Sequence, residues 1–213
     1  MTNPDLTLIA VLLDRSGSMH SIKSDTEGGF NAFIAEQRTR AGAAVVTLAQ
    51  FDTTYERVYT NIPVAEVPAL DLRPRGGTAL LDGIGRLTTE MGEELAALDE
   101  SDRPGTVIVV VITDGEENQS QDWNLTSVKE VISRQESEYG WDYLFLGANI
   151  DAVSVGSRIG FSPDKSITYA ASSTGVDAVF KATSDYASRK RSAPAFSPPV
   201  AGFSDADREA TKK

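Results

Sequence analysis

The 213-residue sequence contains no cysteine and a single histidine, His20. The absence of cysteine excludes disulfide bonds, thiol nucleophiles and zinc sites with cysteine ligands. A histidine-based hydrolase triad would depend entirely on His20, and neither Ser16 nor Ser18 lies in the Gly-x-Ser-x-Gly pattern of a hydrolase nucleophile. These absences argue against thiol, zinc-thiolate and serine-hydrolase chemistry.

Positive charge is also scarce, because 20 lysines and arginines face 31 aspartates and glutamates, a formal net charge of -11. Nucleic-acid binding needs a lysine and arginine footprint, so this balance argues against a nucleic-acid partner. No apolar run approaches the roughly 20 residues of a membrane helix, and the first five residues lack the basic start of a signal peptide. We therefore expect a soluble, cytoplasmic protein without a membrane partner.

What the sequence does contain is an alternation of apolar runs with amphipathic stretches, which is typical of a mostly parallel sheet covered by helices on both faces. We predict strands at about 6–13, 43–51, 55–59, 107–112, 143–148 and 166–170. We predict helices from about 24, and at about 79–98, 125–138, 151–159 and 175–191. The link between the second and third strands is too short for a crossover, so the third strand should return as an antiparallel edge strand. The predicted fold class is α/β, three-layer and doubly wound, with a mostly parallel six-stranded sheet.

Local signals predict two helix starts and the end of the domain. Ser24 begins a capping-box pattern, and Thr78 is suited to be the N-cap of the long helix at 79–98. After Ser192 the composition changes to alanine, proline, serine and glycine. We therefore predict one domain at 1–191 and an extended C-terminal tail at 192–213, in which the capping pattern at Ser204 indicates a short terminal helix. A solvated or loosely docked tail is favoured over a partner-binding arm.

Oxygen-bearing side chains follow the predicted strands. Asp14, Ser16 and Ser18 follow the first strand, Thr78 opens a helix after Gly76-Gly77, and Asp114 follows the central strand within Thr113-Asp114-Gly115. Because ligands gather beyond the carboxyl ends of parallel strands, we expect these groups to converge. Oxygen donors suit hard cations, so Mg²⁺ is the first choice, with Mn²⁺ or Ca²⁺ as alternatives.

The motif Asp14-x-Ser16-x-Ser18, followed by Thr78 and Asp114, resembles the metal-ion-dependent adhesion site (MIDAS) of the von Willebrand factor A (vWA) family. The resemblance extends over about residues 6–190, and three spaced pieces in order are far more specific than the short first motif alone. It implies a vWA/Rossmann-like domain whose metal bridges to an acidic residue of a protein partner. It also implies that the two serines and the threonine are direct ligands, while the two aspartates act partly through water.

The resemblance implies a binding module without catalytic residues, so we expect that the chain is not an enzyme. The chain resembles intracellular bacterial members of the family, which often serve in multiprotein or stress-response systems, more than it resembles extracellular adhesins. We predict a metal-dependent module that binds an aspartate or glutamate of a protein partner and is a monomer when isolated.

Two alternatives stay open. An aspartate after a first strand also occurs in aspartyl-phosphate phosphatases, so Asp14 could be the nucleophile of a Mg-dependent phosphohydrolase. That chemistry usually needs a second acid two residues later, where this chain has Ser16. The other alternative is a structural domain without metal-dependent binding, in which Asp14 and its serines only form a turn and cap a helix. Nearby, Glu117 and Arg75 are interpreted as solvated loop residues.

Overall fold

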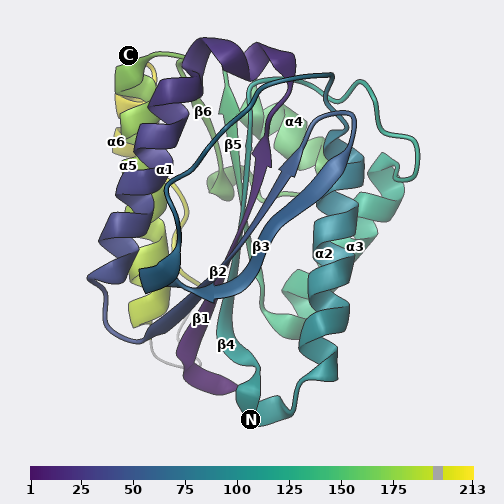
Figure 1. Cartoon of the computed structure of the whole chain (residues 1–213), viewed down its shortest axis with the longest axis vertical. Helices are drawn as coiled ribbons and strands as arrows, with labels where there is room; N and C mark the ends of the chain where they lie inside the picture. The colour runs from purple at the N-terminus through teal and green to yellow at the C-terminus, as the bar shows by residue number, and fades with distance from the viewer. Residues whose placement is uncertain (194–198) are drawn as a thin grey trace.

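A six-stranded sheet lies between two layers of helices in the computed structural model, which describes residues 1–193 and 199–213 (Figure 1). The strand order is β3-β2-β1-β4-β5-β6. The strands are β1 Asn3–Asp14, β2 Ala43–Phe51, β3 Tyr55–Pro63, β4 Pro104–Thr113, β5 Asp142–Ala148 and β6 Ser166–Tyr169. The helices are α1 Lys23–Arg38, α2 Leu80–Ala97, α3 Leu125–Tyr139, α4 Ala152–Ile159, α5 Ser173–Ser192 and α6 Asp205–Ala210. The predicted fold class is confirmed.

Strand pairing brings the carboxyl ends of the central strands to one edge of the sheet. β1 is parallel to β2 and β4, β5 is parallel to β4 and β6, and β3 runs antiparallel to β2 at the edge, as predicted. Asp14 is in register with Phe51, and Leu13 is in register with Ile112. The loops after β1, β2 and β4 therefore leave the sheet side by side, at the end opposite the N-terminus (Figure 1).

The sheet is apolar on both faces because helices cover both. Along β1, Ile9, Val11 and Leu13 pack into the cluster that α1 and α5 cover, whereas Leu8 and Leu12 pack into the cluster that α2 and α3 cover. Figure 1 shows these helix pairs on opposite sides of the sheet. Burial on both faces explains why the strands are nearly continuous apolar runs without alternation.

Two predicted helix caps are wrong. The 3₁₀ helix Gly17–Ile22 runs directly into α1, so Ile22, and not Ser24, occupies the N-cap position, without a side-chain cap. Helix α2 likewise begins after Ala79, and Thr78 does not cap it. Ser24 cannot cap α1 because the preceding 3₁₀ helix places it inside the helix, and Thr78 cannot cap α2 because the helix begins one residue later than a Thr78 cap requires. This leaves the Thr78 hydroxyl available for another role.

The C-terminal segment packs against the domain instead of extending from it. Ser204 caps α6 through a capping box with Asp207, which agrees with the predicted helix start. Phe203 is 6% exposed and lies against Tyr186, and the Thr211 carbonyl accepts a 2.7 Å hydrogen bond from the Ala170 amide. Residues 194–198 of the predicted tail lie outside the described residues, and the proposed boundary at residue 191 stays a prediction.

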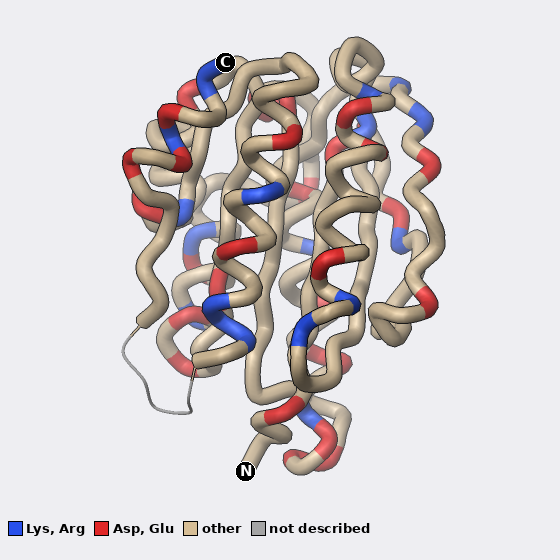
Figure 2. Tube along the Cα trace, turned by 90° about the vertical axis from the view of Figure 1, so that its left-hand side faces the viewer, with Lys and Arg blue, Asp and Glu red and all other residues tan. Residues whose placement is uncertain are grey.

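Charged residues of both signs are interspersed over the face formed by α1, α5 and α6 (Figure 2). This face therefore carries no continuous basic stripe of the kind that tracks a phosphate backbone. Among the described residues, no helix combines the length and apolarity that crossing a bilayer requires.

Candidate metal centre

The carboxylate of Asp14 is held between the ends of two strands. Asp14 is fully buried at the end of β1, and its Oδ1 accepts a 2.6 Å hydrogen bond from the Ser16 amide. Its Oδ2 accepts a 2.6 Å hydrogen bond from the hydroxyl of Thr113, at the end of β4. Burial raises the pKa of Asp14 to about 6, although these hydrogen bonds oppose the rise. A buried carboxylate of this kind is stabilised by a nearby cation.

A chain of hydrogen bonds joins the first motif to the loop after β4. The hydroxyl oxygens of Ser16 and Ser18 lie 3.1 Å apart. The hydroxyl of Ser18 then donates a 2.6 Å hydrogen bond to Oδ1 of Asp114, 96 positions later in the chain. Burial raises the pKa of Asp114 as well. Two carboxylates and two hydroxyls from distant segments therefore meet at one place.

Thr78 brings a third hydroxyl to the same place. Thr78 is buried, with 3% of its surface exposed. A β-carbon built on Gly115 would lie 3.4 Å from the Thr78 hydroxyl oxygen and 4.0 Å from that of Ser18. Both hydroxyls thus face the glycine that follows Asp114. The five side chains predicted as metal ligands converge, and their role as ligands stays a prediction.

The loop after Asp114 fixes the position of Thr78. The Thr78 amide donates to Oδ1 of Asn118, and the Asn118 amide donates to the Thr78 carbonyl, both at 3.0 Å. Glu117 accepts a 2.9 Å hydrogen bond from the Leu81 amide in the first turn of α2. The interpretation of Glu117 as a solvated loop residue is therefore wrong, because its carboxylate satisfies a helix-start amide.

Asp82 completes this attachment from the helix side. Its carboxylate accepts hydrogen bonds of 2.8 to 3.0 Å from the amides of Gln121, Asp122 and Trp123. Loop and helix thus hold each other through reciprocal carboxylates. Sequence reasoning missed these residues because their partners are about 40 positions away, and no local pattern indicates such pairs.

Other acidic residues at this edge are engaged elsewhere. Asp52 is 2% exposed, and its Oδ2 accepts from Nε of Arg15 at 2.9 Å and from Nε of Arg75 at 2.8 Å. Arg75 is therefore an ion-pair partner and not only a solvated loop arginine. Asp151 caps α4 by accepting from the Ser154 amide at 3.0 Å. Neither aspartate is free to join the candidate centre.

The donor set consists entirely of oxygen, with two carboxylates and three hydroxyls. Within the described residues, no group of three or more histidine, cysteine, aspartate or glutamate side chains is suited to hold a metal. A donor set of carboxylate and hydroxyl oxygens suits a hard cation better than zinc or copper. The residues present fit a small divalent ion that keeps part of its water shell.

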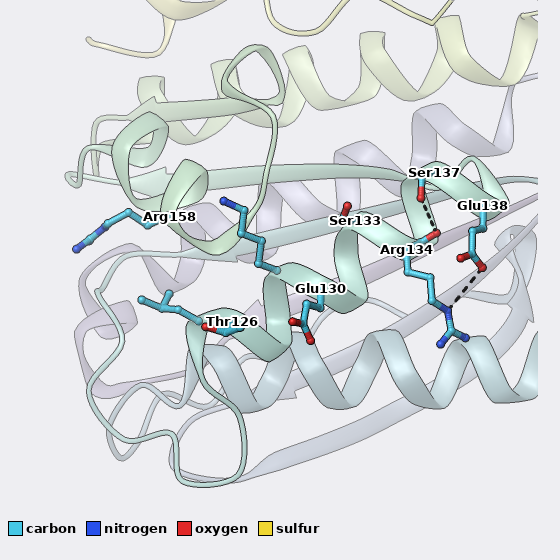
Figure 3. Close-up of a pocket in the computed structure, with 9 residues that line it drawn as sticks. Thr126, Glu130, Ser133, Arg134, Ser137, Glu138 and Arg158 are labelled. Carbon is cyan, nitrogen blue, oxygen red and sulfur yellow. Dashed lines mark hydrogen bonds and ion pairs between the residues drawn. The ribbon is translucent and has the colours of Figure 1, made fainter.

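A separate hollow lies along α3 and extends to Arg158 of α4. It has a volume of about 690 Å³ and is shallow (Figure 3). Arg134 pairs along α3 with Glu138 at 3.8 Å, and Arg158 extends away from the other lining residues and pairs with Glu116 at 3.8 Å. Convergent polar groups of the kind that mark a binding site are therefore better developed at the candidate metal centre.

No family model and no curated protein matches this sequence. Solved structures do match. One is proximal thread matrix protein 1 from the mussel byssus with a zinc-occupied MIDAS motif, at 14% identity and a TM-score of 0.63. The match covers 85% of this chain and 48% of that one. The chain has the von Willebrand factor A fold.

Two further vWA structures agree. A von Willebrand factor type A protein from Catenulispora acidiphila matches at 13% identity and a TM-score of 0.55, over 85% of this chain and 42% of that one. The pilus adhesin SpaC from Lactobacillus rhamnosus GG in its open conformation matches at 15% identity and a TM-score of 0.64. This match covers 84% of this chain and 29% of that one. The chain spans about half the length of the structures it matches, or less. At these identities the likeness establishes the vWA fold alone.

Proposed function

We propose that this chain is a non-enzymatic interaction module that binds a divalent cation through Asp14, Ser16, Ser18, Thr78 and Asp114. The cation, Mg²⁺ in the first instance, then binds the carboxylate of an aspartate or glutamate on a protein partner. The hydrogen-bonded chain from Ser16 through Ser18 to Asp114 supports the proposal, because side-chain oxygens of two distant loops lie within hydrogen-bonding distance of each other.

The charges and positions of the donors support a site that is open to a partner. Two carboxylates neutralise a divalent ion at most, and Mg²⁺ in proteins usually keeps several exchangeable waters. Asp14 and Ser16 are buried, whereas Ser18 is exposed at the surface. A cation held between them can therefore exchange one water for an external carboxylate. The zinc-occupied MIDAS of the mussel protein is a precedent for a metal in this fold.

The phosphohydrolase alternative finds less support. Ser16 lies two residues after Asp14, and its hydroxyl is hydrogen-bonded to the hydroxyl of Ser18, with the two oxygens 3.1 Å apart. A serine hydroxyl is a poor general acid at neutral pH, so the second acid that aspartyl-phosphate chemistry needs is missing at that position. We therefore assign no catalytic residue.

Isothermal titration calorimetry with MgCl₂, MnCl₂, CaCl₂ and ZnCl₂ tests the metal site. We expect saturable binding by the wild type and little by Asp14→Ala, while Asp185→Ala, which removes a carboxylate on α5 that pairs with Lys181, should bind as the wild type does. Equal heats for all three proteins would contradict the metal site. Hydrolysis of a phosphate ester that depends on Asp14 would instead make the chain an enzyme.

A pull-down from the native cell tests the partner. We expect at least one protein to be retained in Mg²⁺ and lost both in EDTA and with the Ser16→Ala/Ser18→Ala variant. A partner retained equally under all three conditions would show that contact occurs away from the metal. The same experiment would identify the multiprotein system, which the sequence does not name.

A further inference from the structure

A second polar cavity lies beside the candidate metal centre. It has a volume of about 450 Å³, and it lies between the β2–β3 hairpin and the segment 68–75. Its polar lining includes Arg15, Tyr59, Arg73 and Arg75. Because Arg15 stands between Asp14 and Ser16 in the chain, the cavity and the metal loop share one stretch of backbone. The Arg15 carbonyl also accepts a 2.7 Å hydrogen bond from the Arg75 amide.

Two buried polar atoms of these lining residues have no hydrogen-bond partner among the described residues. They are Nη2 of Arg15 and the hydroxyl of Tyr59. Arg15 is only 6% exposed, and its other nitrogens are engaged, Nε with Asp52 at 2.9 Å and Nη1 with Glu56 at 2.5 Å. Leaving a buried donor of a charged group unpaired is costly, so the cavity favours an occupant that offers oxygen acceptors.

The arginines are held in place for such an occupant. Arg75 bonds to Asp52 through Nε, and Arg73 bonds to Asp71 through Nε and Nη2. Arg75 lines the cavity, and its side chain is 62% exposed. The planar fork of a guanidinium matches the two oxygens of a carboxylate.

We propose that this cavity binds a second carboxylate of the same acidic partner segment, next to the carboxylate that the metal binds. The partner's identity rests on the proposed function, whereas the cavity itself rests on Arg15, Tyr59 and Arg75. Arg15 lines the cavity and lies between two residues of the candidate metal centre, so the two subsites adjoin, and we expect them to bind acidic residues that are close together in sequence. The carboxylates of Asp52, Glu56 and Asp71 pair with the three arginines and offset their charge, so recognition depends on hydrogen-bond geometry, and a single carboxylate binds weakly.

An acetate titration in EDTA tests the cavity without any contribution from a metal. The arginine Nε–H resonances of ¹⁵N-labelled protein report on binding, with ionic strength kept constant by NaCl. We expect saturable shifts for Arg15 and Arg75. Tyr59→Phe should weaken acetate binding about tenfold, which corresponds to one lost hydrogen bond to a charged group. This variant keeps the fold because it removes only an unpaired buried hydroxyl.

Two more variants separate the cavity from general charge effects. Arg75→Gln should weaken acetate binding as Tyr59→Phe does, whereas Arg134→Gln, which removes an exposed arginine on α3, should behave as the wild type. Shifts that do not saturate, or that are equal in all four proteins, would overturn the proposal. Inorganic phosphate that binds more tightly than acetate, with the same dependence on Tyr59 and Arg75, would assign the cavity to a phosphate group and overturn the carboxylate assignment.

The link between the cavity and the metal is tested by measuring the affinities of two peptides in Mg²⁺ through the fluorescence anisotropy of a fluorescein label. The peptides are Gly-Asp-Gly-Asp-Gly and Gly-Asp-Gly-Asn-Gly. We expect the peptide with two aspartates to bind about tenfold more tightly, and we expect Tyr59→Phe to abolish this advantage. Equal affinities would overturn the shared-segment proposal. If acetate binds in EDTA but calorimetry detects no metal binding, the proposed function fails while the cavity stands, so the two failures are distinguishable.

Discussion

The hydroxyl of Ser18 donates a 2.6 Å hydrogen bond to Oδ1 of Asp114, and this bond connects the loop after β1 with the loop after β4. The two residues are 96 positions apart in the chain. The bond keeps a hydroxyl and a carboxylate together at the surface, where a divalent cation bound as proposed would contact both oxygens. A change at Ser18 should therefore affect cation binding more than it affects folding.

Ser18→Ala tests this relationship. We expect Mg²⁺ affinity to fall about tenfold or more, as for other losses at metal sites, while the free energy of unfolding in EDTA changes little because Ser18 is exposed. Calorimetry and urea unfolding provide the two measurements. Ser21→Ala, in the same 3₁₀ helix, is the matched control. An equal loss of affinity in both variants would show that the effect belongs to the loop and not to the hydroxyl.

Asp82→Ala should loosen the loop that positions Thr78. The Asp82 carboxylate accepts three backbone hydrogen bonds from residues 121–123, so we expect the free energy of unfolding to fall by about 1–3 kcal/mol. Amide exchange at residues 121–123 should become faster. Asp122→Ala removes an exposed carboxylate of the same loop and should have little effect. Unchanged exchange in Asp82→Ala would contradict the role assigned to its carboxylate.

Asp52 should make stability depend on pH in the acid range. Burial opposes ionisation of Asp52, but hydrogen bonds from Arg75 and Thr54 and the charge of Arg15 outweigh it and lower its pKa to about 2. An aspartate in the unfolded chain has a pKa near 3.9. Asp52 therefore contributes about 2 kcal/mol above pH 4, which is lost as the pH falls towards 2. Urea unfolding of the wild type and Asp52→Asn across this range should show a difference that shrinks at low pH. A difference that is constant with pH would show that the charge of Asp52 does not stabilise the fold.

Gly28 and Gly29 form a matched pair within α1. A β-carbon on Gly29 would lie 2.2 Å from Cδ2 of Phe180 on α5, whereas one on Gly28 would meet nothing within 4 Å. We expect Gly29→Ala to destabilise the protein by about 1–3 kcal/mol through overpacking. Gly28→Ala should stabilise it by up to about 1 kcal/mol, because alanine favours the helix. Thermal unfolding of both variants measures these changes in stability. A stabilising Gly29→Ala would mean that α1 and α5 are packed less closely than the contact between Gly29 and Phe180 indicates.

Phe203→Ala tests whether the C-terminal segment is part of the folded unit. Phe203 is 6% exposed against Tyr186, so we expect a loss of about 3 kcal/mol in the free energy of unfolding. A chain that ends at residue 191 should lose at least as much, because it also lacks the bond between Thr211 and Ala170. If the shortened chain is as stable as the whole, the predicted boundary at residue 191 is correct and the packing contributes nothing.

Sequence reasoning succeeded where one local pattern was sufficient. The predicted strand at 43–51 has the observed bounds, and Val107 to Ile112 lies in the central β4, because a continuous β-branched run is stable only when both faces are covered. It failed at Ser24, which lies inside α1, and at Thr78, which lies one residue before the N-cap of α2, although both have the residue type of a cap. Helix caps depend on what the preceding loop contacts, and composition does not reveal this.

The sequence by itself determined the α/β architecture and the approach of Asp14, Ser16, Ser18, Thr78 and Asp114 to one edge. Alternating patterns specify which segments become strands, and parallel strands have their carboxyl ends at the same edge. Only the tertiary structure decided what surrounds those five side chains. The attachment of Glu117 and Asp82, and the pairing of Asp52 with Arg15 and Arg75, join groups 23 to 41 positions apart. Such bonds form only after the chain has packed, so no local rule predicts them.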